Sequence, residues 1–451
     1  MSAPNEEKIV KLNLLKTLLV SAAIVIPVGV GVTTTFAQTA AAPAAAGGLK
    51  AGAARVEITP QQADLPAPAF RSITDQLFVR ALVLDNGVTR SAIVVGDLPT
   101  IGPKELLDLQ RDIAAEIKAP TGNVVMAVTH NHSMVRIDHT VEGILLPGSP
   151  KITDQVMAAT LQAVKQALAK MQPARAGYAE GKTQAIGRRP QQAVVEFNPN
   201  DQGPADASLG VFKVESLSGE PIAFLINSGL EPVMIAPLSG EVSADVAGVA
   251  ERHIEKRYGD KPVAMYTVSS ISSAYYSSRR QGSIPAAPDP HVLMNAVGAI
   301  VGEDAMLVAA QVKPTNDLRI SGVLTSLQCP GKVTTPLNTA AQCSDAPGSK
   351  LPACKFTDRD APPVKLQVGV LKIGDMTITQ ADANITQPVW QRLKAKAPPR
   401  TMLVASVYGP MKYVVEDAAY PSNSYVATAT TAKVGCAADS YVNTTLDLLK
   451  R

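Results

Sequence analysis

From Ala53 onward, short apolar runs alternate with longer segments in which apolar residues recur at three- and four-residue spacing. The short runs are rich in Val and Ile and are bounded by Gly, Pro, Asn or Asp, a pattern typical of β-strands, whereas the longer spacing indicates amphipathic helices. Regular alternation of the two is typical of an α/β architecture. We therefore expect one large α/β domain over residues 51–451, built on a mixed sheet with flanking helices.

The individual elements follow from these periods. Helices are expected at Pro103–Ile117, Thr153–Met171, Val242–Tyr258, Val292–Val312, Gln387–Lys396 and Ala437–Leu449. Strands are expected at Leu77–Leu84, Ser91–Val95, Asn123–Thr129, Gly210–Val214, Ile222–Asn227, Val263–Val268, Leu318–Leu324, Val364–Ile373, Met376–Thr379 and Met402–Val407. The tripeptide Asp85-Asn-Gly87 favours positive φ, so it predicts a hairpin between the first two strands.

The N-terminal 37 residues have the pattern of a secretory signal peptide. Three lysines precede an uncharged apolar run over 18–32, and the small residues Thr35 and Ala37 lie three and one positions before a cleavage point after Ala37. We expect export to the periplasm or the medium. An uncleaved membrane anchor over 17–35, which is long enough to span a bilayer, is the alternative. Residues 38–50 are rich in Ala, Pro and Gly and are expected to form a linker.

Four cysteines fall in the expected exported part of the chain, where disulfides persist. Three lie in a Pro/Ser/Thr-rich stretch, 325–363, which we expect to be a loop insertion. Their spacing includes no Cys-x-x-Cys pair, so it favours disulfides over a zinc site. The sequence leaves three pairings open among Cys329, Cys343, Cys354 and Cys436.

Composition and charge exclude several classes of function. With 42 Lys and Arg against 39 Asp and Glu, the formal net charge is only +3, which is too weak a field to indicate a nucleic-acid partner. The chain also has no Gly-rich phosphate loop, no Gly-x-Ser-x-Gly elbow and no Cys-x-x-Cys redox pair. Peripheral contact with a membrane remains open, and no oligomeric state is indicated.

The segment Asn123–Ser133 carries the most informative chemistry. Alternate side chains of a strand share a face, so His130 and His132 are expected to leave the end of a buried strand on one side. Such a pair suits one zinc ligand and one neighbouring acid or base that transfers a proton. Hydrogen-bonding loop histidines without a catalytic role are the alternative interpretation.

Thr129-His-Asn-His-Ser133 resembles the Thr-His-Thr-His-Ser-Gly-Pro motif of the neutral/alkaline, non-lysosomal ceramidase family. Further similar segments occur in the family's order, covering nearly the whole expected domain. They are Ala54-Arg-Val-Glu-Ile-Thr-Pro60, Ala92-Ile-Val-Val-Gly-Asp97, Ile186-Gly-Arg-Arg-Pro190, Ser243-Ala-Asp-Val-Ala-Gly248, Lys412-Tyr-Val-Val and Ala419-Tyr-Pro-Ser-Asn-Ser-Tyr425. We expect no counterpart of the immunoglobulin-like C-terminal domain of the long ceramidases in residues 51–451.

The resemblance implies roles for five residues. It makes His130 a zinc ligand, His132 the neighbouring active-site histidine and Arg188 the active-site arginine. It also makes Tyr413 a tyrosine close to zinc and Tyr425 a tyrosine that contacts substrate. Members of the family are similar in cleaving the amide of ceramide with a zinc-activated water.

Two ligand positions depart from the family. The second zinc histidine aligns with Glu231, and the zinc glutamate aligns with Asn384. Glu can replace His as a ligand, but the neutral amide of Asn is a weak partner for zinc. Asp382, two residues earlier, would lie on the same face if the strand continues, and is the alternative ligand. The family's Gly-Asp loop is replaced by Ser272-Ser-Ala-Tyr-Tyr276.

The resulting hypothesis is an exported hydrolase that uses one zinc ion to cleave an amide in a ceramide-like lipid. His132 would transfer the proton, and Arg188 or Tyr425 would stabilise the oxyanion. A degenerate member that binds a lipid or another ligand without turnover is the alternative, because two ligand positions have changed. A hydrolase with another small-molecule substrate is a third.

Overall fold

The computed structural model describes residues 48–140, 147–185, 206–235, 239–270, 289–334, 343–345, 352–354, 357–405, 409–422 and 425–451. The expected signal peptide and most of the expected linker lie outside these residues. The described part contains helices on both sides of stacked sheets, so the α/β expectation is confirmed. The arrangement of the sheets differs from the expected single sheet.

The largest sheet has eight strands in the order β10-β8-β7-β6-β1-β3-β4-β5. The pairs β4/β5 and β8/β10 are parallel, and the other neighbours are antiparallel. In that order the strands are β10 (Val263–Val268), β8 (Pro221–Ser228), β7 (Ser208–Ser216), β6 (Gln172–Lys182), β1 (Lys50–Glu57), β3 (Phe78–Asp85), β4 (Arg90–Gly96) and β5 (Val124–Val128).

This sheet is bent in the middle. Strands β1 and β6 share only two residue pairs, Lys50 with Pro173 and Ala51 with Gln172. The two halves face each other, because β10 contacts β1, β3, β4 and β5 across the interior. Their inner faces form one apolar core that includes Leu82, Val125 and Met265. The bend therefore brings the carboxyl ends of β5 and β8 to one end of the domain.

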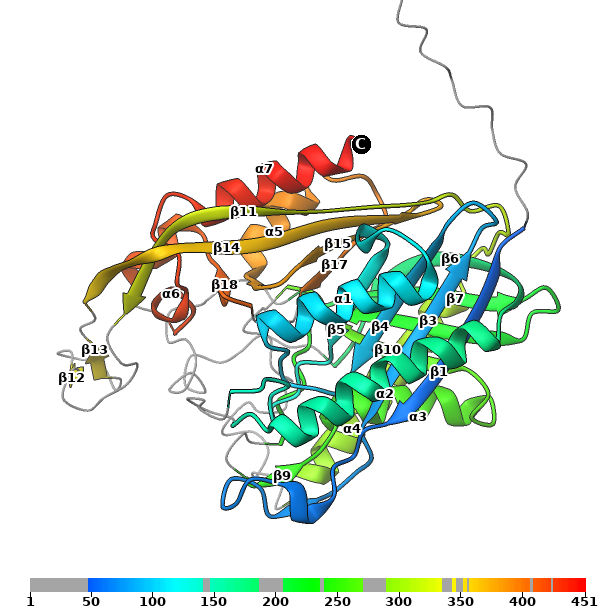
Figure 1. Ribbon diagram of the computed structural model, residues 1–451, viewed down its shortest axis with the longest axis horizontal. Coiled ribbons are helices and arrows are strands. Elements are labelled where there is room, and N and C mark those ends of the chain that lie inside the picture. The colour runs from blue at the N-terminus through cyan, green and yellow to red at the C-terminus, as the bar shows by residue number, and fades with distance from the viewer. Residues whose placement is uncertain are drawn as a thin grey trace, which may run out of the picture. The chain divides into compact units, whose positions relative to one another are not determined.

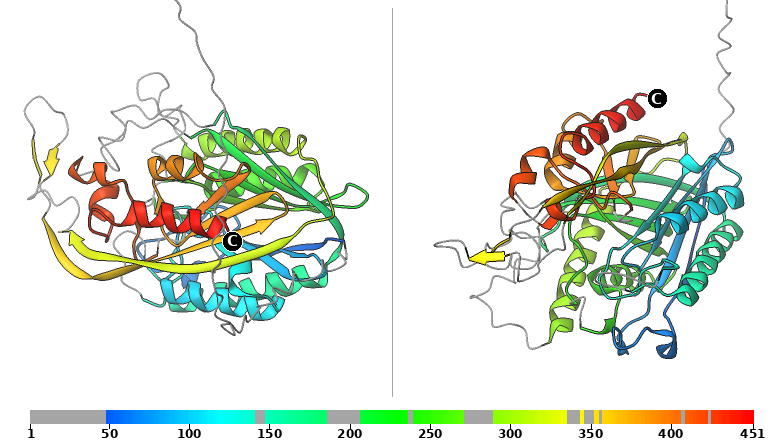
Figure 2. Two further views of the ribbon diagram at one scale, coloured as in Figure 1. Left: turned by 90° about the horizontal axis from the view of Figure 1, so that it is seen from above. Right: turned by 60° about the vertical axis from the view of Figure 1, so that its left-hand side comes forward.

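Helices cover the outer faces of both halves (Figures 1 and 2). One half carries α1 (Pro103–Ile117) and α2 (Pro150–Ala169), and the other carries α3 (Asp245–Arg257) and α4 (Pro290–Ala309). Pro at the first position of α1, α2 and α4 fits a turn whose N–H groups have no partner within the helix. The result is four layers: helices, half-sheet, half-sheet, helices.

A second sheet of four strands, in the order β11-β14-β15-β17, closes one side of the interior. Its outer face packs against α5 (Gln387–Lys394) and α7 (Ala437–Leu449), with Trp390 and Tyr441 buried between them. The strands are β11 (Ile320–Thr334), β14 (Asp358–Ile373), β15 (Met376–Ala381) and β17 (Thr401–Ala405). Short pairs are formed by β2 (Ser72–Ile73) with β9 (Glu241–Val242), β12 (Cys343–Asp345) with β13 (Pro352–Cys354), and β16 (Asn384–Ile385) with β18 (Tyr413–Val414); α6 spans Tyr425–Ala429.

The stretch 325–363 is not an irregular loop throughout. Strand β11 continues to Thr334 and β14 begins at Asp358, so the two form a long antiparallel ribbon through most of this segment. Its polar residues suit a ribbon because one side is partly exposed, which a search for apolar runs does not detect. Lys332 is buried here, with Nζ donating to the carboxylate of Asp358 and to the carbonyl of Ala427.

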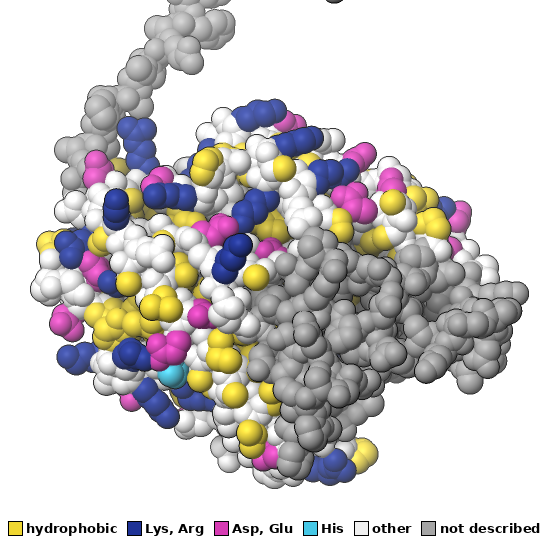
Figure 3. All heavy atoms as spheres, turned by 180° about the vertical axis from the view of Figure 1, so that it is seen from behind, with side chains coloured by type: hydrophobic (Ala, Val, Ile, Leu, Met, Phe, Trp, Pro, Cys, Tyr) yellow, Lys and Arg dark blue, Asp and Glu magenta, His cyan; other side chains and the backbone are white. Residues whose placement is uncertain are grey.

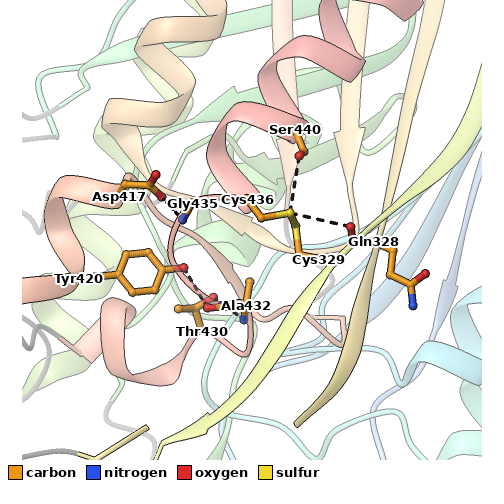
Figure 4. Close-up of a disulfide and its surroundings, with 9 residues drawn as sticks. All are labelled: Gln328, Cys329, Asp417, Tyr420, Thr430, Ala432, Gly435, Cys436 and Ser440. Atoms are coloured by element: carbon orange, nitrogen blue, oxygen red, sulfur yellow. Dashed lines mark hydrogen bonds between the residues drawn. A yellow bond between two sulfur atoms is a disulfide. The ribbon is translucent and has the colours of Figure 1, made fainter. Parts of the chain in front are cut away.

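A disulfide joins this ribbon to the last helix. Cys329 of β11 bonds to Cys436, the residue before α7, across 107 positions of sequence (Figure 4). This resolves one of the pairings that the sequence leaves open. The backbone register of β12 and β13 places Cys343 directly opposite Cys354.

Helix α4 is long and apolar enough to cross a membrane by length and composition alone. In the described structure it packs against α3, β6 and β7, with Val297, Val301 and Val308 in the core. We therefore regard α4 as a core helix of the domain. On the face shown in Figure 3, Lys/Arg and Asp/Glu side chains are intermixed, in line with the nearly balanced net charge.

Candidate metal centre

The centre begins where β5 ends. Thr129 N donates to Gly96 O, and His130 N donates to Leu98 O, so the chain leaves the sheet alongside β4. His130 has φ +58°, in the left-handed region, so the chain turns and does not continue as a strand. The expected strand alternation therefore does not hold at this point. Even so, the rings of His130 and His132 lie 5.1 Å apart, edge to face.

His130 is held in one tautomer. Its Nδ1 lies 2.6 Å from the carbonyl oxygen of Pro99, which can only accept, so Nδ1 carries the proton. The imidazole is fully buried, and burial lowers its pKa; Glu231 opposes this effect and His132 adds to it. A neutral ring with a protonated Nδ1 presents the lone pair of Nε2 to the interior of the centre.

Glu231 meets both histidines. It follows β8, about a hundred residues further along the chain, and its Oε1 lies 3.4 Å from Nε2 of His130 and 3.3 Å from Nε2 of His132. The carboxylate is 14% exposed, and the His132 side chain is 16% exposed. Glu231, which aligns with a zinc histidine in the resemblance, therefore still offers a possible metal ligand to the centre.

These three side chains could hold a metal ion. One ligand atom from each lies within 4.8 Å of the others. Ligands about 2.1 Å from a tetrahedral zinc are about 3.4 Å from each other, which agrees with the distances from Glu231 to the two histidines. Two histidines and one carboxylate are also a common ligand set of catalytic zinc.

Asn384 completes the inner side of the centre. It is fully buried in β16, and its Nδ2 lies 3.3 Å from Nε2 of His130, to which it can donate. Among the described residues its Oδ1 has no hydrogen-bond partner. Rotation of the amide would place this oxygen toward the ligand atoms, so the residue can adapt to a cation. Buried oxygens without a partner are uncommon, and a bound water or ion is one explanation for them.

Tyr413 lies next to Asn384. The two residues are in register in the parallel pair β16/β18, so their side chains lie on the same side of it. Tyr413 is buried, and its carbonyl accepts a hydrogen bond from Thr430 Oγ1. The structure therefore makes Tyr413 a neighbour of Asn384, and its role close to zinc stays a prediction from the resemblance.

Asp382 does not join the centre. Its Oδ1 accepts from Gln367 N, and its own carbonyl accepts from Gly409 N. Asp382 lines a small cavity of about 10 Å³ between α1 and the second sheet. Burial raises its pKa to about 6. Strand β15 ends at Ala381, so the alternation expected between Asp382 and Asn384 is interrupted.

Three expectations cannot be placed. Arg188 and Ser272–Tyr276 lie outside the described residues. Tyr425 begins α6, but its side chain is not described. Sequence-based predictions assign no role to Pro99, whose carbonyl fixes the His130 tautomer. No sequence motif indicates this contact, because it depends on how the turn after β4 packs against the end of β5.

Comparison with known proteins agrees with this geometry at the level of the fold. The crystal structure of neutral ceramidase from Pseudomonas aeruginosa superimposes with a TM-score of 0.72 and 16% sequence identity, covering 89% of this chain and 74% of that one. The chain has the fold of neutral ceramidase. A second structure, described as a ceramidase complexed with C2, gives the same TM-score and identity over 89% of this chain and 75% of that one. No family model and no curated protein sequence matches the chain.

Proposed function

We propose that this protein is an exported, zinc-dependent amidohydrolase that cleaves the amide bond of a ceramide-like lipid. The observation that carries the proposal is the convergence of His130, His132 and Glu231 within a ceramidase fold. Zinc, when bound, would polarise the amide carbonyl and lower the pKa of the attacking water. The expected signal peptide, which would deliver the protein to the periplasm or the medium, remains a prediction from the sequence.

The protein's own groups supply orientation and charge. His130 is fixed by Pro99, and Glu231 brings the negative charge that offsets a divalent cation in a nearly closed centre. His132 is the more exposed histidine, and its Nε2 can either ligate the ion or accept and return a proton. The stabilisation of the oxyanion by Arg188 or Tyr425 remains part of the proposal.

The test is the zinc content of the purified protein, measured by plasma emission together with hydrolysis of a short-chain ceramide. The wild type should hold about one zinc per chain, and His130→Ala and Glu231→Gln should each lose both zinc and activity. His132→Ala distinguishes the two roles of that histidine. Loss of zinc indicates a ligand, whereas retained zinc with lost turnover indicates the proton carrier.

A non-catalytic, lipid-binding protein of the same fold is the second candidate. The observation in its favour is the hydrogen bond from Asn384 to His130, which satisfies the imidazole without any ion. A wild-type protein that remains free of zinc after incubation with zinc salts, and that binds ceramide vesicles without hydrolysing them, would support this candidate.

A further inference from the structure

The short segment that carries Glu231 is anchored at its start by a buried tyrosine. Tyr266 lies in β10, next to β8, and its hydroxyl donates to the carbonyl of Leu230 at 2.6 Å. The ring is fully buried in the core beneath α3 and α4. A single phenol therefore fixes the peptide unit that joins Leu230 to Glu231.

A buried carboxylate anchors the other end of the segment. Asp245 Oδ2 accepts from Ile235 N at 2.8 Å, and its Oδ1 accepts from Val246 N at 2.5 Å. Asp245 is fully buried and has φ +54°, a conformation that Asp and Asn tolerate better than other residues with a side chain. The segment 230–235 is thus held at both ends by groups from the core.

The same segment is tied to the histidine loop. Ser133 Oγ donates to the carbonyl of Ile235 at 3.3 Å, and Ser243 N donates to the carbonyl of Ser133 at 2.9 Å. These hydrogen bonds connect the loop that carries His130 and His132 to the segment that carries Glu231. A displacement of segment 230–235 would therefore alter the distances from Glu231 to both imidazoles.

We propose that Tyr266 and Asp245 are positioning residues that set the metal affinity of the centre by fixing Glu231 relative to His130 and His132. This inference rests on the proposed function insofar as Glu231 is a metal ligand. Groups that orient ligands in this way commonly change metal affinity by about 10- to 100-fold when they are removed. Neither residue reaches the ligand atoms itself.

The test uses Tyr266→Phe, which removes one hydroxyl, and Asp245→Asn, which leaves only one acceptor oxygen for the N–H groups of Ile235 and Val246. Tyr258→Phe is the matched control, because Tyr258 stacks on Phe224 at the end of α3 and its side chain forms no hydrogen bond with segment 230–235 in the described structure. Two measurements are made on each full-length protein. They are amide hydrogen exchange of the metal-free protein over 228–240, and the zinc dissociation constant from competition with a chromogenic chelator.

We expect faster exchange over 228–240 and a zinc dissociation constant raised by about tenfold or more in Tyr266→Phe and Asp245→Asn, with neither change in the control. Unchanged zinc affinity in both variants, with or without faster exchange, would overturn the inference while leaving the zinc centre intact. A wild-type protein that binds no zinc would instead contradict the proposed function. Exchange in the metal-free protein shows separately whether the two anchors hold the segment.

Discussion

At the scale of single residues, Asn384 is a buried polar group that contacts His130 through one hydrogen bond, and its chemistry bears on ion binding. Its amide can donate to the His130 lone pair when no cation is present, and its buried Oδ1 has no partner among the described residues. A neutral oxygen adds little affinity for zinc. Asn384 therefore satisfies the His130 lone pair in the metal-free protein, and we expect it to add little to zinc binding.

Asn384→Asp should strengthen zinc binding and destabilise the metal-free protein. We expect the zinc dissociation constant to fall by about tenfold or more, because a carboxylate replaces an amide beside the ligands. The metal-free protein should lose about 1–3 kcal/mol in the free energy of unfolding, because a buried carboxylate would then lie against His130, which Glu231 already contacts. Chelator competition and urea denaturation measure the two effects. Equal zinc affinity in both proteins would show that Asn384 does not face the ion.

Asp245 makes the stability of the domain depend on pH. Burial raises its pKa to about 6, against hydrogen bonds from Ile235, Val246 and Met234 that lower it, while Asp75 raises it slightly. Because the pKa is higher in the folded state, the stabilisation is complete below about pH 4 and is lost as the pH rises through about 6. A rise from about 3.9 to about 6 corresponds to about 3 kcal/mol.

The measurement is the free energy of unfolding by urea from pH 4 to pH 7, for the wild type and for Asp245→Asn. The variant should be less stable than the wild type at pH 4, since it loses a hydrogen bond there, but its stability should fall less as the pH rises to 7. Subtracting the two curves removes the contributions of other buried acids such as Glu251. Parallel curves would contradict a raised pKa at Asp245.

At the scale of elements, the β11/β14 ribbon and α7 are connected covalently. The Cys329–Cys436 disulfide closes a loop of 107 positions that contains three strands of the second sheet, β14, β15 and β17 (Figure 4). Near it, Tyr420 donates to the carbonyl of Ala432, and Gly435 N donates to Asp417. The segment that includes Tyr413 and α6 is thereby held between the ribbon and the last helix.

Replacing Cys329 and Cys436 with Ser should lower the free energy of unfolding by about 2–5 kcal/mol, because the unfolded chain regains the freedom of a long loop. Replacing Cys343 and Cys354, which stand opposite each other in β12 and β13, is the matched control and should have a smaller effect. Guanidinium denaturation compares the two, and peptide mapping without reduction checks the pairing. Finding Cys329 joined to Cys343 would contradict the arrangement.

At the scale of the whole molecule, the prediction concerns export. Expressed from its own start codon in a secreting bacterium, the protein should be recovered from the periplasm or the medium with Gln38 as its first residue. N-terminal sequencing gives the answer directly, and Ala37→Leu, which places a large residue before the cleavage point, is the control that should block processing. A membrane-bound protein that retains residues 1–37 would favour the anchor.

The sequence by itself determined most of the elements and one half of the centre. Apolar periodicity is a local property, and it placed α1, α7 and β10 at the bounds that the structure has. It missed β6, where Gln172–Lys182 mixes Gly, Pro and charged residues, because a strand beside a sheet bend needs no continuous apolar run. The His130/His132 pair was evident because both residues lie in one short motif.

Only the tertiary structure decided which residues meet these histidines. Asn384 contacts His130 across 254 positions of sequence, and Glu231 arrives from the opposite half of the bent sheet. Spacing along the chain contains no information about such contacts, because they depend on how the half-sheets stack and where β5 and β8 end. The same packing turned Asp382 away and selected Cys436 as the partner of Cys329. Local patterns determine elements, whereas the centre forms only when long-range packing brings their ends together.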